Sequence, residues 1–438
     1  MSADIALPRL MTLCLLLSLA ACQGERSTVT SAQTSRAQMA SENPWLQAGA
    51  AAAEVSPQPG AFIAGDARNR RFAGEHDPLY ARAVVFAHGE QAAAIVVVDN
   101  IGLGHPDVQR IQRRAAELTT SLELAAERIL VSSTHTHSGP DVTGLWGEHE
   151  LSSGRDETYM AQLIEAAARQ VAAAAASRQP VELLIGSANV PLSWVENVTE
   201  PGLLDSRLTV VRLQAIDGTT VATLTNYACH PTVLDGVSDQ VSADYVGGFY
   251  RAMSERFDGE HLFLQGAIGG WVQPVKDGRG FELADRYGTT IAEAAQRALA
   301  EAEPWRMPRL DFQRHRFEIP LENPGFLALL EAGVLQRPLY DGHIRTEVAY
   351  LALGGVSLAT HPGETSPAHS LATRQMLGGE HTMVLGLTQD ALGYILKPEY
   401  FAAATDIPSA DYLTATSIGP EAAPRMLQAL RAVIPAAH

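Results

Sequence analysis

Residues 129–140 carry two histidines that are separated by one residue and follow an apolar run. Side chains at positions i and i+2 share a face of an extended chain, so His135 and His137 can point into one cavity. Gly139 and Pro140 then end the strand and place both imidazoles at its rim. Paired imidazoles of this kind suit a divalent metal, or one metal ligand beside one acid–base group. A surface or core position would also account for an isolated pair of histidines.

A second apolar run, which begins at Leu224, also leads to a histidine followed by a proline. His230 can therefore supply a third imidazole at the end of another strand. Cys229 stands beside it and invites a thiolate interpretation, as a nucleophile or as a metal ligand. Adjacent residues of a strand face opposite sides, so we expect Cys229 to be a small buried side chain that takes no part in the chemistry.

Two further strand ends carry possible oxygen donors. An apolar run and the turn Pro362-Gly363 precede Glu364, which could supply a carboxylate. His361 is a competing ligand, or a group that orients one. Tyr394 follows a glycine and stands between apolar residues, and these neighbours alone predict a core position for its ring.

Strands and helices must position these residues. Apolar runs and two-residue periodicity predict strands near residues 80–88, 92–99, 128–133, 181–187, 208–213, 221–227, 348–359 and 383–387. Helical periodicity predicts helices near residues 107–122, 156–176, 245–257, 284–300 and 420–433. Adjacent strands occur as well as strand–helix alternation. The order predicts a mixed α/β (α+β-like) fold, with layered β-sheets flanked by helices and the metal site at strand ends.

The four motifs occur in the order and rough spacing of the neutral/alkaline (non-lysosomal) ceramidase family, which the chain resembles. The residues that carry the resemblance are Thr134 to Pro140, His230, Pro362 to Glu364, and Gly393-Tyr394. Residues 74–83 and 242–244 also look like segments of that family, and the similarity covers about Ala48 to Tyr400. The resemblance implies a catalytic domain that hydrolyses the amide bond of ceramide or a related N-acyl lipid.

The resemblance also implies one zinc ion (Zn2+) per chain with four protein ligands, which would be His135, His230, Glu364 and Tyr394. His137 would be a catalytic residue that contacts the substrate or its transition state. Two imidazoles and a carboxylate leave zinc acidic enough to lower the pKa of a bound water to about 7, and a phenol can be held loosely. The metal-bound hydroxide would attack an amide carbonyl, while His137 stabilises the oxyanion or gives a proton to the leaving amine.

Some segments depart from the family pattern. Full-length members carry a further C-terminal immunoglobulin-like domain, and the 38 residues after Tyr400 are too few for one. The family's arginine-containing substrate loop corresponds to residues 189–197, which hold no arginine, and residues 270–274 lack the serine sometimes cast as a nucleophile. A zinc mechanism is therefore favoured over a serine nucleophile. A second tyrosine that contacts the substrate has two candidates, Tyr400 and Tyr412.

Two aspartates are candidates for orienting the metal ligands. Asp99 ends the valine-rich strand, and Asp244 follows the segment after His230. Each could accept a hydrogen bond from a ligand, and each could instead cap a turn.

The first residues of the chain have the composition of an export signal. Arg9 precedes an apolar run from Leu10 to Ala21, which is short for a membrane span. The run ends in Leu-Ala-Ala-Cys22, which resembles a bacterial lipobox, so we predict a lipoprotein signal peptide over residues 1–21. Residues 22–44 would be a lipidated cysteine and a flexible tether rich in Ser, Thr, Gln and Ala. A plain secretory signal is the alternative.

The residue after the cysteine bears on location. Gln23, by resemblance to sorted lipoproteins, favours the outer membrane over retention in the inner membrane. We therefore expect an exported protein that is lipid-anchored in a bacterial cell envelope and faces the periplasm or the surface. Residues 45–438 would form a single zinc hydrolase domain, because the predicted metal ligands span its length.

The charge balance excludes one class of partner. The chain has 438 residues, with 32 Lys and Arg against 49 Asp and Glu and a formal net charge of −17. Nucleic-acid binding needs a basic stripe, so we expect no nucleic-acid partner. A hydrophobic share of 46% and a charged share of 18% are typical of a chain that buries a large core. Attachment through a lipidated Cys22 needs no basic patch, so an acidic protein can still be bound to a membrane. The expected partners are therefore a membrane and, from the family resemblance, a small N-acyl substrate.

Two other functions fit the same motifs. A metal-dependent esterase, lactonase or phosphoesterase could use the same residues, although phosphoesterases often hold two metals about 3.5 to 4 Å apart and these motifs supply ligands for one. A non-enzymatic lipoprotein could bind a ligand and keep the metal for structure, since structural zinc sites are closed by four protein ligands.

Overall fold

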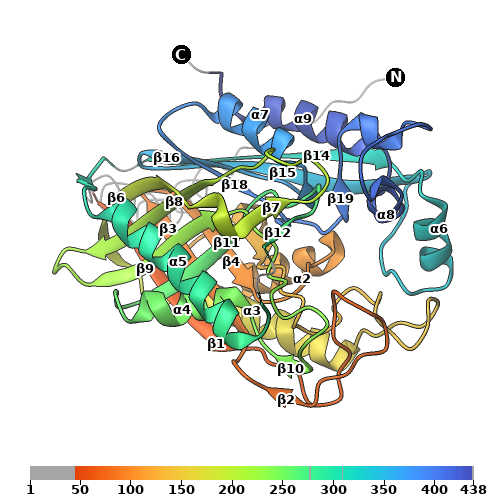
Figure 1. The fold of residues 1–438 in the computed structure, drawn as a ribbon. Coiled ribbons are helices and arrows are strands. Elements are labelled where there is room, and N and C mark those ends of the chain that lie inside the picture. Colours follow the sequence, from red (N-terminus) through yellow and green to blue (C-terminus); the bar gives the residue numbers. More distant parts are fainter. Residues whose placement is uncertain (1–44, 276–277, 308, 437–438) are drawn as a thin grey trace, which may run out of the picture. The chain divides into compact units, whose positions relative to one another are not determined.

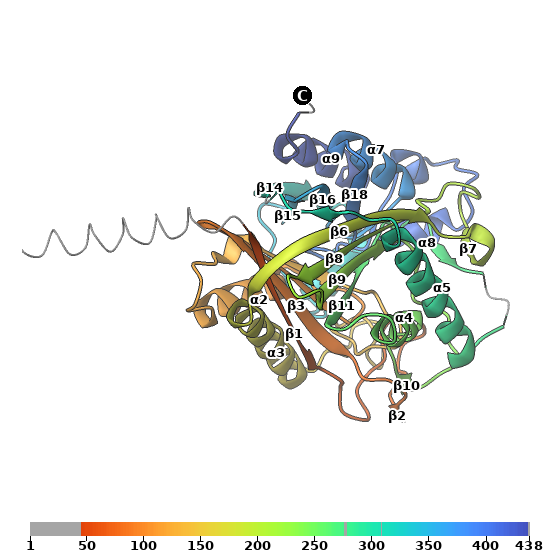
Figure 2. The same ribbon diagram turned by 90° about the vertical axis from the view of Figure 1, so that its left-hand side faces the viewer.

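The architecture is built from two β-sheets that pack face to face, with helices against the outer face of each (Figure 1). The computed structural model describes residues 45–275, 278–307 and 309–436. These residues belong to one compact unit that begins at Trp45. A view turned by 90° shows the layers in the order helix, sheet, sheet, helix (Figure 2).

The larger sheet has nine strands, and its central strands are apolar on both faces. Its order is β11-β9-β8-β6-β1-β3-β4-β5, with β13 paired to β6. Alternate residues of β4 (Gln91–Val98) enter two different cores, since Val96 packs toward the helices and Ile95 toward the second sheet. The other strands are β1 (Leu46–Glu54), β3 (Tyr80–His88), β5 (Ile129–Ser133), β6 (Gln179–Asn189), β8 (Arg207–Ala215), β9 (Thr220–Tyr227), β11 (Glu260–Gln265) and β13 (Pro304–Trp305).

Four helices cover the outer face of the larger sheet, namely α2 (His105–Leu118), α3 (Glu157–Ala176), α4 (Tyr245–Ser254) and α5 (Phe281–Leu299). The start of α3 is fixed by Asp156, which accepts hydrogen bonds from the backbone N–H groups of Thr158 and Tyr159. The alanine-rich face of α3 lies close to β1. A Cβ on Gly49 would lie 2.2 Å from the carbonyl oxygen of Ala174, so only glycine permits this approach.

The second sheet has four strands in the order β14 (Leu310–Pro320), β15 (His343–Leu353), β16 (Val356–Thr360) and β18 (His381–Leu385). Its outer face is covered by α9 (Ala422–Val433), and α7 (Pro367–Leu377) lies against β16 and β18. The prediction of one strand over residues 348–359 is wrong. Gly354 reverses the chain at a φ of +55°, and β15 and β16 form an antiparallel hairpin. Both strands are buried and apolar, so the hydrophobic pattern of the sequence gives no sign of the turn between them.

Several short strands and helices lie outside the two large sheets. Three short pairs are β2 (Gly74–Glu75) with β10 (Gln240–Val241), β7 (Val195–Asn197) with β12 (Val272–Pro274), and β17 (Glu364–Thr365) with β19 (Tyr394–Ile395). The remaining helices are α6 (Pro324–Glu331) and α8 (Ala410–Ala415), with 3₁₀ turns η1 (Ala126–Arg128), η2 (Leu192–Trp194) and η3 (Pro398–Phe401).

The predicted fold class is confirmed, because layered sheets are flanked by helices on both sides. The sequence analysis did not predict the strands β1, β11 and β14, the strands of two or three residues, or the helices α6, α7 and α8. The predicted signal peptide (1–21), and the lipidated cysteine with its tether (22–44), lie outside the described residues. Within the part of the chain that the structure describes, no helix is long and apolar enough to cross a membrane.

Candidate metal centre

His135 lies just beyond the end of β5, where the backbone is left-handed. The strand ends at Ser133, and His135 has a φ of +69°. The prediction that the paired histidines share a face of an extended strand is therefore wrong in its geometry. Such a φ costs about 1 to 3 kcal/mol in a non-glycine residue, and the N–H of His135 donates to the Asn100 carbonyl at 2.8 Å. The turn still brings both rings together, with 3.3 Å between the Nε2 atoms of His135 and His137.

Backbone carbonyls fix the ring orientation of two of the histidines. Nδ1 of His135 lies within hydrogen-bond distance of the Ile101 oxygen, and Nδ1 of His230 lies 2.6 Å from the Val272 oxygen. A carbonyl oxygen can only accept, so each Nδ1 carries a proton, and in the neutral ring Nε2 then keeps its lone pair. Burial also lowers the pKa of His230, which favours the neutral ring. This is the arrangement of histidines that bind a metal through Nε2.

Glu364 and Tyr394 come from two short strands that pair in parallel. The register of β17 and β19 places the two residues directly opposite each other. Oε2 of Glu364 lies 3.1 Å from Nε2 of His230 and 3.5 Å from Nε2 of His135. Burial, and then the charge of Glu364, raise the pKa of Tyr394 well above its usual value. The phenol therefore stays protonated unless a cation lies close to it.

The donor set fits a zinc ion. When both rings are neutral, two nitrogen lone pairs and a carboxylate oxygen face one another, and such acceptors repel unless a proton or a metal cation lies between them. Nitrogen and oxygen donors of these types are common zinc ligands. The ligand atoms of His135, His137 and His230 also lie within 4.8 Å of one another, so three histidines form a second possible ligand set. All five site residues predicted from the sequence thus lie together.

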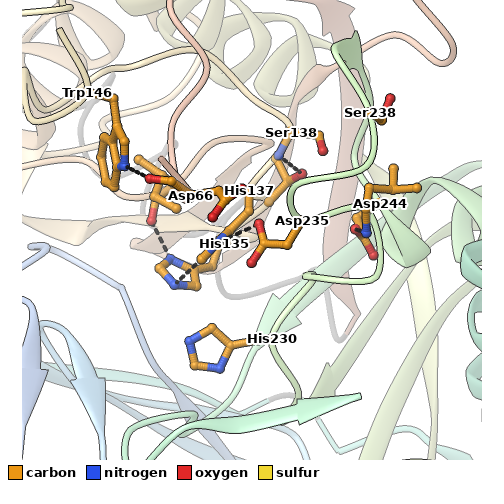
Figure 3. A network of polar contacts seen from close by, with 12 residues as sticks. Asp66, His135, His137, Ser138, Trp146, His230, Asp235, Ser238 and Asp244 are labelled. Atoms are coloured by element: carbon orange, nitrogen blue, oxygen red, sulfur yellow. Dashed lines mark hydrogen bonds and ion pairs between the residues drawn. The ribbon is translucent and has the colours of Figure 1, made fainter. Parts of the chain in front are cut away.

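A carboxylate that the sequence analysis missed holds His137. Nδ1 of His137 lies 3.2 Å from Oδ1 of Asp235, and Figure 3 shows His135, His137 and Asp235 in a row with His230 facing them. Burial lowers the pKa of His137, but the charge and hydrogen bond of Asp235 outweigh this effect, so the pKa is raised. Asp235 follows His230 in the same loop, and this proximity in sequence was the available signal.

Gly65 provides the space for the ring of His137. A Cβ at this position would lie 2.4 Å from Cγ of His137, and the φ of Gly65 is +108°. Any larger residue would have to displace the imidazole as well as adopt a strained backbone.

Asp244 and Asp99 act on the elements around the site. Asp244 accepts hydrogen bonds from the N–H of Tyr245 at the start of α4 (2.6 Å) and from the N–H of Leu234 (2.8 Å), and burial raises its pKa to about 7. It therefore fixes the loop that carries Asp235. Asp99 accepts hydrogen bonds from Tyr80 and Tyr250, which join β3 and α4 to the end of β4.

Cys229 and His361 point away from the candidate metal. Cys229 is buried, and burial raises the pKa of its thiol well above the usual value, as expected of a small core side chain. The ring nitrogens of His361 lie 2.8 Å from the hydroxyl of Thr365 and 3.0 Å from that of Thr373. His361 is thus occupied by neighbouring hydroxyl groups and does not compete with Glu364 for the metal.

Two solved structures share this architecture. The crystal structure of neutral ceramidase from Pseudomonas aeruginosa matches with a TM-score of 0.73 at 16% identity, covering 89% of this chain and 75% of that chain. The chain has the fold of a neutral ceramidase. A second structure, described as ceramidase complexed with C2, gives a TM-score of 0.72 at 15% identity, covering 90% of this chain and 77% of that chain. No family model matches the sequence, and no curated protein does.

The predicted resemblance to ceramidases is thus confirmed at the level of the fold. The structure also separates the two candidates for a second tyrosine at the site. Tyr412 is 52% exposed, and its ring centroid lies 6.5 Å from that of Tyr394. Tyr400 is buried, and its hydroxyl bonds to Thr199 and Glu200. Tyr412 is therefore the tyrosine that a substrate could reach.

A largely apolar pocket opens beside the candidate metal centre. Four site residues line it together with Tyr412, and they are His135, His137, Glu364 and Tyr394. Its apolar lining comes mainly from the segment before α2, from α6 and from the loops around β19, and includes Ile101, Leu321, Phe326, Leu330, Leu335, Ile344, Leu392 and Ile418. A pocket of this kind, with a few polar groups at one end, suits an amphiphilic ligand.

Proposed function

We propose that this chain is a zinc-dependent amidohydrolase that cleaves an N-acyl amide, with ceramide or a related N-acyl lipid as its substrate. The observation that carries the proposal is the convergence of Glu364 with two histidines whose Nδ1 atoms are held by carbonyls, beside an apolar pocket. The likeness to two ceramidase structures supports the same reaction class.

Each residue of the site has a distinct task in this reaction. His135 and His230 would hold zinc through Nε2, and Glu364 would balance part of its charge. Zinc bound there would polarise the amide carbonyl and lower the pKa of a water to about 7. Tyr394, opposite Glu364 in register, would complete the ligand set and keep the carboxylate in place.

His137 would handle the proton of the leaving amine. Asp235 accepts the hydrogen bond from Nδ1, so Nε2 of His137 faces the cavity and can take up and release a proton. The resulting imidazolium is stabilised by the adjacent carboxylate. The substrate's amine side would therefore lie toward Gly65 and Asp235, and its acyl chain toward Leu392 and α6.

Ester, lactone and phosphoester hydrolysis are tested by the same substrate panel. Among the described residues, one cluster of three or more histidine, cysteine or acidic side chains has its ligand atoms close enough together for a metal. A single metal favours amide or ester cleavage over the two-metal chemistry common in phosphoesterases. A closed, purely structural zinc would give metal binding without turnover of any substrate.

The test couples metal analysis to mass-spectrometric detection of the products of N-acyl amides, esters, lactones and phosphodiesters. The products are a fatty acid from an amide or ester, a hydroxy acid from a lactone, and a phosphomonoester from a phosphodiester. We expect one zinc per chain and release of fatty acid from at least one amide. His135→Ala should lose both zinc and turnover, whereas His137→Ala should keep zinc and lose about 100- to 10,000-fold in kcat. The exposed His149 offers a matched control, and His149→Ala should change neither.

Three results would change the proposal. Full amidase activity after chelation would overturn the zinc mechanism. Loss of zinc in His137→Ala would assign the metal to the three histidines, and two metals per chain would favour a phosphoesterase. Zinc binding with no turnover across the whole panel would leave a metal-binding lipoprotein.

We also propose that the chain is anchored through a lipidated Cys22 in a bacterial envelope, at the outer membrane. The support is the lipobox-like sequence before Cys22 and the Gln23 that follows it. Mass spectrometry of the mature N-terminus in an expressing bacterium should find acylated Cys22, and Cys22→Ser should release the protein into the soluble envelope fraction. An unmodified mature N-terminus downstream of Cys22 would indicate a plain secretory signal instead.

A further inference from the structure

The apolar pocket beside the metal centre has a neighbour. A second, more polar cavity is lined by His105, Gln109, Arg316, Glu318, Tyr340 and Arg345, among others. Two residues, Pro106 and Arg337, line both cavities. These two side chains therefore lie at the boundary between the apolar pocket and the polar cavity.

Two chain segments run from the metal centre to this boundary. One begins at Ile101, whose carbonyl holds His135, and reaches Pro106 at the start of α2. The other begins at Tyr394 and runs back to Asp390, which binds Arg337. Four residues of chain span at most about 14 Å, so the Cα atom of Asp390, whose side chain binds Arg337, lies within about that distance of the Cα atom of Tyr394.

Arg337 is fixed at the boundary by a buried carboxylate. Its Nη2 donates to Oδ2 of Asp390 at 2.9 Å and its Nη1 to Oδ1 at 3.3 Å. The side chain of Asp390 is 0% exposed and that of Arg337 is 12% exposed. Asp390 also accepts a hydrogen bond from the N–H of His105 at 2.9 Å, at the first residue of α2. The two parallel hydrogen bonds fix the orientation of the guanidinium group. Separating the pair would leave a buried charge without a partner, so the side chain of Arg337 is held in place.

We propose that Arg337, held by Asp390, is the end wall of the pocket and sets the longest acyl chain that the enzyme accepts. This inference rests on the proposed function, since it names the specificity determinant of the same site. A hydrocarbon chain gains free energy while it moves along the apolar lining. Contact with the buried ion pair does not stabilise the hydrocarbon chain further. The chain would displace polar contacts of the two charged groups and offer no hydrogen bonds in return.

The test is a chain-length profile with N-acyl amides from butanoyl to hexadecanoyl. For the wild type, kcat/KM should rise with length and then stop rising or fall at medium length. Arg337→Ala combined with Asp390→Asn opens the wall without stranding a charge, and should move the maximum to longer chains. The gain should be about tenfold for every two further methylenes that enter the opened space.

Two matched variants control this test. Arg337→Lys keeps the wall filled and should retain the wild-type length profile. Arg345→Ala removes an arginine that lines the second cavity alone, where it pairs with Glu318 at 2.7 Å, and should also leave the profile unchanged. Thermal melting of each variant shows that it folds.

A binding measurement separates this inference from the proposed function. Free fatty acids of the same lengths are titrated calorimetrically into the zinc-free protein, where the wall should impose the same limit. A length limit in binding, moved by the double variant, supports the wall even if no amide is cleaved. The same profile in the wild type and the double variant, in turnover or in binding, would overturn it.

Discussion

At the scale of single residues, the site assigns different tasks to its histidines through the atom that each Nδ1 meets. His135 and His230 face neutral backbone carbonyls, whereas His137 faces the carboxylate of Asp235. A carbonyl orients a ring without stabilising a positive charge on it, so the first two rings suit a metal. A carboxylate stabilises an imidazolium, so the third suits proton transfer.

This distinction predicts the behaviour of Asp235→Asn. The amide cannot balance an imidazolium, so kcat should fall about 10- to 100-fold, while zinc content stays at the wild-type level. Steady-state kinetics with parallel metal analysis checks both. Asp239→Asn, on the same loop and exposed, should be indistinguishable from the wild type. Loss of zinc in Asp235→Asn, or unchanged kcat, would refute the role of Asp235.

Gly65→Ala should disable the site through its neighbour His137. The new Cβ would lie 2.4 Å from Cγ of His137, so the ring must shift, and a misplacement of about 1 Å can cost about 100-fold in kcat. Gly60→Ala is the matched control, because Gly60 has a φ of +89° and a Cβ added there would have no neighbouring atom within 4 Å. Both variants should lose about 1 to 3 kcal/mol of unfolding free energy through strain. Equal kcat values for Gly65→Ala and Gly60→Ala would show that backbone strain, and not displacement of the His137 ring, causes any loss of activity.

At the scale of elements, apolar runs predicted most of the strands that carry the site. The predicted strand over 80–88 agrees with β3, and β5 and β9 begin within a residue of their predictions. The runs predict well because both faces of these strands are buried. The left-handed turn at His135 and the contact of Asp235 with His137 depend on chain segments that meet only after folding. The hairpin at Gly354 was missed because its two buried strands form one continuous apolar run in the sequence.

One carboxylate makes the junction of β3, β4 and α4 sensitive to pH. Burial raises the pKa of Asp99 from 3.8 to about 6. The folded state then binds more protons than the unfolded state between about pH 4 and pH 6, so this contribution is present below pH 4 and is lost as pH rises to 6. The loss is at most about 3 kcal/mol.

Asp99→Asn should remove this pH dependence. Urea unfolding at the two ends of the window should show the variant gaining stability relative to the wild type at the higher pH. A constant difference between wild type and variant across the window would contradict the assignment.

At the scale of the whole molecule, the candidate ligands come from both sheets. His135 and His230 follow β5 and β9 of the larger sheet, whereas Glu364 follows β16 and Tyr394 follows β18 of the second sheet. A metal bound here would therefore join the two layers as well as supply the chemistry. The same ion would then be needed both for amide hydrolysis and for holding the two sheets together.

Zinc removal should accordingly lower the stability of the whole fold. Zinc at about 100 times its Kd adds about 2.7 kcal/mol to the unfolding free energy, provided that it does not bind the unfolded chain. Differential scanning calorimetry should therefore show a lower Tm after chelation and full recovery when zinc is added back. His137→Ala should show the same shift, because His137 is not among the proposed ligands, whereas His135→Ala should melt at one temperature with or without zinc. If chelation leaves the wild-type Tm unchanged while abolishing turnover, the metal does not join the sheets, and its part is confined to the reaction.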